Sequence, residues 1–169
     1  MLHKFDNTSP EFMSIRKEWM ALLARAPDTL LNDIVGPHIA STQPRWLRRP
    51  ETGLMMIQAR VGGSGERFNL GEVTVTRCAL RLGEMDDASP VGVSYVLGRD
   101  HKQAQLAAVA DALLQDATHH GDLEVTLLEP VRQFLKQKQS TRDARAQTTK
   151  VDFFTVAREA SSGEDGELS

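Results

Sequence analysis

The sequence predicts an α+β fold: N-terminal helices, then an antiparallel sheet of four to five strands, then two helices after this meander. Two changes in the spacing of apolar residues, which divide the chain into three segments, predict it. Apolar residues recur every three to four positions up to residue 35, at every second position between residues 45 and 97, and every three to four positions again after residue 100. The connections between strands are short, so the strands are expected to pair antiparallel, because a parallel pair needs a long crossover.

Two helices are expected at the N-terminus. Ser9 is an N-cap residue followed by Pro10 at the first helical position, and Pro27 ends the helix. Asp28 can cap a second, short helix, which is expected to stop at Gly36-Pro37. The apolar stripe of the first helix consists of Phe12, Ile15, Trp19, Leu22, Leu23 and Ala26.

Four strands are expected in the middle of the chain, the first two of them joined across Pro50–Gly53. The third strand changes phase, because its apolar residues stand at odd positions at Val73 and Val75 and at even positions from Cys78 onward. This slip predicts a β-bulge at Thr76-Arg77. The expected strands are residues 45–49, 55–61, 73–82 and 91–97.

The chain is expected to return to helix after Asp100, which is the predicted N-cap. A last helix has Pro130 in its first turn. Residues 136–150 are polar, so a helix there would need a partner surface or would remain solvated. Val151–Ala157 is apolar and β-prone and is the predicted fifth strand. The stripe of the helix after Asp100 consists of Leu106, Val109, Ala110, Leu113 and Leu114.

Length and composition are those of one globular domain: 169 residues, 40% hydrophobic and 25% charged. Residues 1–160 are expected to form it, followed by a disordered acidic tail at 161–169. The net charge of −3 argues against nucleic-acid binding. No apolar run approaches the ~20 residues that span a membrane, so we expect a cytoplasmic protein without a membrane partner. The single cysteine, Cys78, excludes an intramolecular disulfide and is predicted to be a buried structural thiol.

A glycine-rich loop after the second strand is the strongest candidate for a binding site. Three glycines allow φ > 0, so backbone N–H groups could hold an anion, and charged residues lie in the same loop. Two arginines, Arg67 and Arg77, are expected at one end of the sheet. The alternative is surface charge, or an Arg–Glu pair that shapes the loop. The candidate anion- or partner-binding residues are Gly62, Gly63, Gly65, Glu66, Arg67, Arg77 and Arg99.

Other chemistry is not indicated. The loop matches neither the phosphate-loop spacing nor the dinucleotide-binding fingerprint. The five histidines show no metal-ligand spacing, and no serine or threonine lies in a nucleophile motif. No acid–base pair has an orienting group beside it. No catalytic residue, metal site or cofactor of this chain is therefore predicted.

A series of short motifs carries a family resemblance. Arg16 and Trp19-Met20 lie in the first helix, and the other motifs follow in order. These are Glu51-Thr-Gly-Leu54, Ile57-Gln-Ala-Arg60, the loop at 62–68, Thr74-Val-Thr-Arg77, Gly98-Arg-Asp100, Asp111-Ala-Leu113 with Gln115, and Val151-Asp-Phe-Phe-Thr155. From about residue 14 to 158 the chain resembles PhnG, a subunit family of the bacterial carbon–phosphorus lyase core complex. One departure is Gln105, where the family pattern has an acidic residue.

The resemblance implies a function that the residues alone do not. PhnG-like proteins assemble with PhnH-, PhnI- and PhnJ-like subunits and act with a PhnL-like ATP-binding-cassette protein. The assembly transfers a phosphonate to C1′ of ATP, its substrate, with release of adenine, and forms a ribose 1-phosphonate 5-triphosphate. This chain would be a non-catalytic subunit, inactive alone.

Two alternatives from other classes stay open. One is an enzyme subunit that binds the triphosphate directly through Glu66, Arg67, Arg77 and Arg99. The other is a stand-alone binding module of unrelated function. The isolated chain is expected to form a homodimer, to exchange an element, or to associate stably with another subunit, because exposed strands invite pairing.

Overall fold

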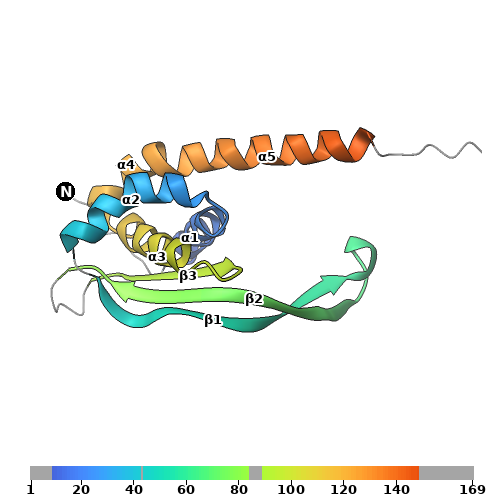
Figure 1. Cartoon of the computed structure of the whole chain (residues 1–169), viewed down its shortest axis with the longest axis horizontal. Helices are drawn as coiled ribbons and strands as arrows, with labels where there is room; N and C mark the ends of the chain where they lie inside the picture. The colour runs from blue at the N-terminus through green and yellow to red at the C-terminus, as the bar shows by residue number, and fades with distance from the viewer. Residues whose placement is uncertain (1–8, 43, 84–88, 149–169) are drawn as a thin grey trace, which may run out of the picture.

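Helices cover one side of a three-stranded sheet in the computed structural model, which describes residues 9–42, 44–83 and 89–148 (Figure 1). In chain order the elements are α1 (Pro10–Leu23), α2 (Asp28–Thr42), β1 (Arg45–Arg60), a 3-10 turn (Val61–Gly63), β2 (Arg67–Arg81), β3 (Val91–Leu97), α3 (His101–Leu114), α4 (Ala117–Leu123), a π-helical turn (Glu124–Leu128) and α5 (Glu129–Thr148). The π-helical turn joins α4 to α5 without a break, so two helical stretches follow the sheet. The α+β architecture is confirmed.

The second helix is longer than predicted. The first helix begins as expected, because the Ser9 hydroxyl accepts a hydrogen bond from the backbone N–H of Phe12 at 3.1 Å. The second continues through Pro37 to Thr42, so the predicted stop at Gly36-Pro37 is wrong. A proline removes one helical hydrogen bond. Beyond the proline the helix still packs against the core through the partly buried Ile39, which favours its continuation.

The described sheet has three strands, in the order β1-β2-β3, with both pairs antiparallel. The prediction of a separate strand at 45–49 is wrong, because Arg45–Arg60 is one continuous strand. Pro50 is tolerated there because β1 lies at an edge of the sheet, where a missing N–H donor breaks no ladder. The predicted fifth strand, Val151–Ala157, lies outside the described residues, as does the tail at 161–169.

The irregularity predicted at Thr76-Arg77 belongs to the neighbouring strand. The pairing of β2 with β3 runs without interruption through these two residues. Against β1, by contrast, the register shifts between Arg48 and Glu51, so the additional residue is in β1. The change of phase along β2 has another cause: Cys78 joins the core on the helix-covered face, while Val75 is buried outside that cluster on the other face.

The core lies between the sheet and the helices. Most of α3 is buried, and it packs directly on β3. The closest approach is at Gly92, where an added Cβ would collide with the Ala108 carbonyl oxygen and would lie 2.8 Å from the Ala112 Cβ. A glycine at this position therefore lets a helix and a strand approach more closely than any side chain would allow.

Two arms extend from this body in the same direction (Figure 1). One is the part of the β1–β2 hairpin that β3 does not reach, because β3 pairs only with Val75–Arg81 of β2. The other is the second half of α5, where every residue from Lys136 to Thr148 is exposed. The polar segment at 136–148 is thus a helix that stays solvated in the single chain. No helix in the described ranges is long and apolar enough to cross a membrane.

Candidate functional site

The glycine-rich loop forms the tip of the hairpin arm. Gly62 and Gly63 have φ values of 59° and 83°, in the left-handed region that glycine adopts most easily. At Gly65 an added Cβ would lie 2.7 Å from the carbonyl oxygen of Val61, to which the Gly65 N–H donates at 2.8 Å. Arg60 also donates to the Gly65 carbonyl, at 3.1 Å. The turn itself therefore explains why these glycines are needed, and anion binding by the loop stays a prediction.

The structure separates the arginines that we expected at one end of the sheet. Arg67 begins β2, and Arg77 lies ten residues further along the same strand. At about 3.3 Å per residue, roughly 33 Å separate them. The expected placement is wrong, so Glu66 and Arg67 at the tip cannot share one small ligand with Arg77.

Arg77 forms an exposed ion pair with Glu51, a residue outside the glycine-rich loop. Its Nε lies 2.7 Å from Oε1 of Glu51, which also accepts from Arg48 at 2.7 Å. These hydrogen bonds, from Arg48 first and then from Arg77, lower the pKa of Glu51. Both side chains of the Arg77–Glu51 pair are about half exposed. Arg77 therefore has an internal partner while remaining accessible from solvent.

Arg99 is exposed in the turn between β3 and α3. This turn is held by the N–H of Gly98, which donates to the Thr74 carbonyl at 2.9 Å, and by the hydroxyl of buried Thr76, which donates to the Gly98 carbonyl at 2.8 Å. Thr74 is three residues from Arg77 along β2, so Arg99 lies nearer to Arg77 than to the glycine loop. The seven candidate residues thus fall into two groups. The group at the hairpin tip consists of Gly62, Gly63, Gly65, Glu66 and Arg67, and the group at the body consists of Arg77 and Arg99.

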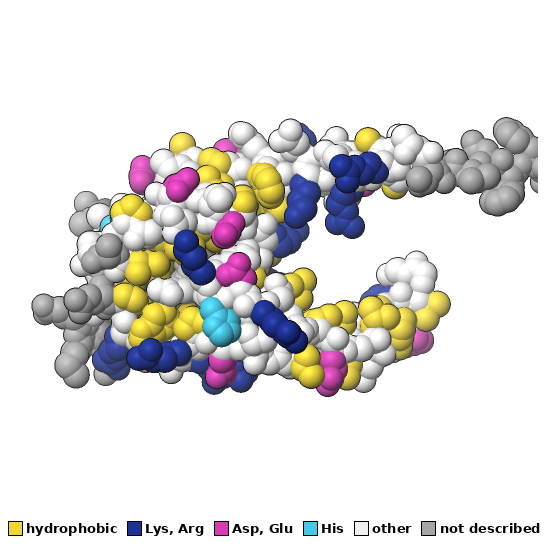
Figure 2. Space-filling model, in the orientation of Figure 1, with side chains coloured by type: hydrophobic (Ala, Val, Ile, Leu, Met, Phe, Trp, Pro, Cys, Tyr) yellow, Lys and Arg dark blue, Asp and Glu magenta, His cyan; other side chains and the backbone are white. Residues whose placement is uncertain are grey.

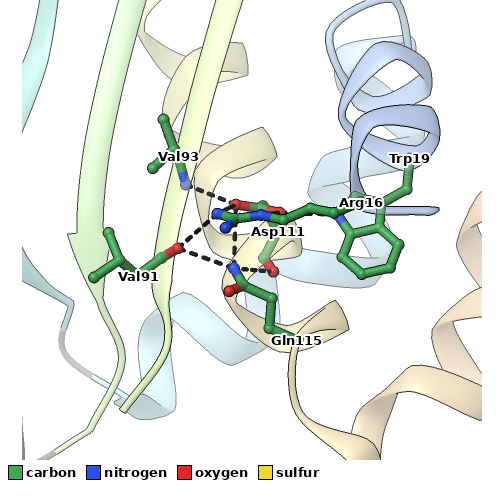
Figure 3. Close-up of polar contacts among 6 residues, drawn as sticks. All are labelled: Arg16, Trp19, Val91, Val93, Asp111 and Gln115. Atoms are coloured by element: carbon green, nitrogen blue, oxygen red, sulfur yellow. Dashed lines mark hydrogen bonds and ion pairs between the residues drawn. The ribbon is translucent and has the colours of Figure 1, made fainter. Parts of the chain in front are cut away.

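A buried carboxylate that we did not predict as a site joins α1 to α3 (Figure 3). Asp111 is completely buried, and Arg16 approaches both of its oxygens, with Nε 3.2 Å from Oδ1 and Nη2 2.7 Å from Oδ2. The indole N–H of Trp19 donates to Oδ1 at 2.8 Å. This is a two-point Arg–carboxylate pair with a further donor, a geometry typical of strong buried ion pairs.

The same cluster covers the free edge of β3. Oδ2 of Asp111 accepts from the backbone N–H of Val93 at 2.9 Å. The carbonyl of Val91 accepts from Arg16 at 3.0 Å and from Gln115 at 2.9 Å. An edge strand carries unpaired N–H and C=O groups that would otherwise attract another strand. Here two of these groups are satisfied by side chains of α1, of α3 and of Gln115, the C-cap residue of α3.

Comparison with known protein families decides the identity of the chain. Residues 14–159 match the family model described as "Phosphonate metabolism protein PhnG". The chain belongs to the PhnG family. A PhnG relative from Rhizobium meliloti (strain 1021), named "Alpha-D-ribose 1-methylphosphonate 5-triphosphate synthase subunit PhnG", is 40% identical over 155 residues, which are 89% of this chain and 90% of the relative. The resemblance inferred from the motifs is confirmed.

Several motif residues of this PhnG chain meet in the Asp111 cluster. Arg16, Trp19, Asp111 and Gln115 helped to carry the resemblance, yet sequence reasoning assigned them no role. A signal was present, because Asp111 is the one charged residue within the otherwise apolar run 106–114 and Gln115 follows it by one helical turn. The cluster positions secondary structure rather than performing chemistry, since both carboxylate oxygens are occupied by internal donors.

Two further groups of this PhnG chain have structural roles. The thiol of Cys78 is buried, as predicted, and burial raises its pKa to about 11. Asp116 caps α4 by accepting from the N–H of Thr118 at 3.0 Å, and its other oxygen lies 2.9 Å from Nδ1 of His119. Within the described ranges, His, Cys, Asp and Glu side chains form no group of three or more that could hold a metal ion.

Proposed function

We propose that this chain is a non-catalytic subunit of a ribose 1-methylphosphonate 5-triphosphate synthase. In this role it supports transfer of a phosphonate to C1′ of ATP, with release of adenine. The observation that carries the proposal is the 40% identity, over nearly the full length of both chains, to a protein named as a subunit of that synthase. We infer that it works in the cytoplasm, where ATP is available, with PhnH-, PhnI- and PhnJ-like subunits and a PhnL-like protein.

The chemistry of the described residues supports a role without catalysis. Asp111 is saturated with hydrogen-bond donors, and the Cys78 thiol is buried and neutral at physiological pH. General acid–base catalysis needs a group that can reach the substrate with a free proton or lone pair. In this proposal the chain contributes a scaffold and contact surfaces, and it binds no cofactor of its own.

A second candidate function is direct binding of the triphosphate by this subunit. Arg67 and Arg99 are exposed, and neither forms an ion pair within the described part of the chain. Free guanidinium groups are suited to phosphate. In that case one of the two groups, at the tip or at the body, would line the active site of the assembly.

Reconstitution tests the proposed function. The purified chain is incubated with ATP and methylphosphonate, alone and with the PhnH-, PhnI- and PhnL-like proteins, and adenine is measured by chromatography. We expect no adenine from the chain alone, turnover by the full set, and loss of turnover when only this chain is omitted. Turnover by the chain alone that survives further purification would overturn the non-catalytic role.

A further inference from the structure

A cleft opens between the two arms (Figure 2). Lys and Arg side chains of α5 project into this opening, and the hairpin arm forms the opposite wall. Next to the body the cleft contains a groove of about 470 Å³. Its lining residues are Arg25, Leu135, Lys136, Lys138, Gln139 and Arg142.

The α5 wall continues the core-facing stripe of this helix. Val131 is buried and Leu135 packs against the core. Lys138 and Arg142 follow at the spacing of three and four that keeps residues on one helix face. Where the body ends, the same face therefore changes from apolar to basic.

The residues that line the groove carry positive charge, and the carboxylate of Asp143 stands beside them, where it accepts from Gln139 at 2.9 Å. Four of the six lining residues are cationic and none is acidic. Lys136 and Arg142 form no ion pair within the described ranges. The ammonium group of Lys138 lies 5.9 Å from the centre of the Phe134 ring, and Arg25, just after α1, donates to the Ala21 carbonyl of that helix at 2.8 Å. The α5 wall is therefore complementary to a negatively charged surface.

The opposite wall carries apolar side chains of β1 beside polar side chains of β2, because Leu54 and Met56 pair with Thr74 and the exposed Glu72. Thr52 of β1 lies beside Thr76, with hydroxyl oxygens 3.2 Å apart, on the helix-covered face of the sheet. Residues two and four positions later, Leu54 and Met56, share this face by strand alternation. They are 68% and 49% exposed. A two-stranded ribbon is marginally stable in water, as is a short helix without tertiary contacts, so both arms would gain stability from an occupant.

We propose that the cleft between α5 and the β1–β2 hairpin holds an acidic, amphipathic segment of another subunit of the synthase. Its carboxylates contact Lys138 and Arg142, and its apolar side covers Leu54 and Met56. The inference rests on the proposed function and adds to it the chemistry of the partner. A small phosphate compound fits this cleft less well, because the hairpin wall offers it exposed apolar side chains and the carboxylate of Glu72, and the cations stand on exposed side chains.

Two double variants with equal changes in charge test the basic wall. Lys138→Gln/Arg142→Gln neutralises the wall, and Gln137→Glu/Ala144→Glu makes the same change in net charge on the opposite side of α5. All four positions are exposed, so both variants should keep the wild-type melting temperature. By calorimetry with the other assembled subunits, we expect the first variant to bind at least about tenfold more weakly, and the control within about twofold of wild type. Equal affinity of the two variants would overturn the inference.

Hydrogen exchange gives an independent measurement that does not depend on activity. Amides of residues 136–148 should exchange rapidly in the isolated chain and become protected in the assembly. Unchanged exchange there in an assembly that contains the chain would overturn the inference alone, while failure of the wild-type chain to join the other subunits would overturn the proposed function. Self-association that only the first variant abolishes, or equal protection by tripolyphosphate, would assign the cleft to another occupant.

Discussion

The carboxylate of Asp111 connects three parts of the chain: α1 through Arg16 and Trp19, the edge of β3 through Val93, and α3, on which it lies. The side chain of Arg16 is only 19% exposed, so its charge depends on this partner. Removing one member of such a pair leaves the other charge and a backbone donor without an acceptor.

We therefore expect Asp111→Ala to lower the free energy of unfolding by about 3–5 kcal/mol, measured by urea denaturation. Glu51→Gln is the control, because it removes a carboxylate from an exposed cluster and should leave the melting temperature nearly unchanged. If the two variants lost similar stability, the Asp111 cluster would not be the connection that its geometry indicates.

Cys78 should make stability fall at alkaline pH. Burial raises its pKa in the folded chain to about 11, above the ordinary value of 9.0, so folding favours the protonated thiol. The free energy of unfolding therefore keeps its full value below pH 9. It falls by roughly 2–3 kcal/mol as the pH rises towards 11, because the unfolded chain loses the thiol proton first. Urea denaturation between pH 8 and 11 should show a steeper decline for wild type than for Cys78→Ala. Equal slopes would show that the thiol ionises as easily in the folded chain as in the unfolded one.

At the scale of elements, the contact between α3 and β3 depends on one missing side chain. Gly92→Ala would place a Cβ against the carbonyl of Ala108 and the side chain of Ala112, both on a buried helix. We expect a loss of stability of at least about 1–3 kcal/mol. Gly53→Ala, in β1, is the matched control because nothing lies within 4 Å of its added Cβ. The melting temperatures of both variants test this prediction. If Gly92→Ala lowered the melting temperature no more than Gly53→Ala, α3 would be able to move away from the sheet.

The two arginines of β2 should act independently. Arg77→Ala breaks an exposed pair with Glu51, and Arg67→Ala removes an exposed charge at the hairpin tip, so neither should change the melting temperature much. Because about 33 Å of strand separates them, their effects on binding to the other subunits should add in free energy. Pull-down and adenine release with the single and double variants test this. Strong non-additivity would place both residues at one site despite their separation.

At the scale of the whole molecule, the two arms make the isolated chain a poor monomer. The hairpin arm exposes large apolar side chains, among them Leu54 and Leu70, and every residue of α5 from Lys136 to Thr148 is exposed. We expect a homodimer or larger species at micromolar concentration by light scattering, and a defined complex once other subunits are present. A monodisperse monomer with all strand amides protected from exchange would contradict this expectation.

Local chemistry was sufficient to predict most elements. The caps of α1 and α3 act as expected, through Ser9 and through Asp100, which accepts from the N–H of Gln103 at 2.9 Å. The spacing of apolar residues predicted the helices and the sheet, and the short motifs identified the family. These signals are readable because capping and periodicity involve residues within one or two turns of each other.

Only the tertiary structure decided the rest. Whether α2 ends at Pro37, and whether β1 continues past Pro50, depends on packing and on strand pairing with distant residues, which overrides the local signal of proline. Arg16 meets Asp111 across 95 positions of sequence. The distance between Arg67 and Arg77 depends on whether the strand between them folds back or runs straight. The sequence by itself determined most elements and the family, because both depend on patterns among residues that are close together in the chain. The buried cluster and the cleft arise only when segments far apart in sequence come together in space.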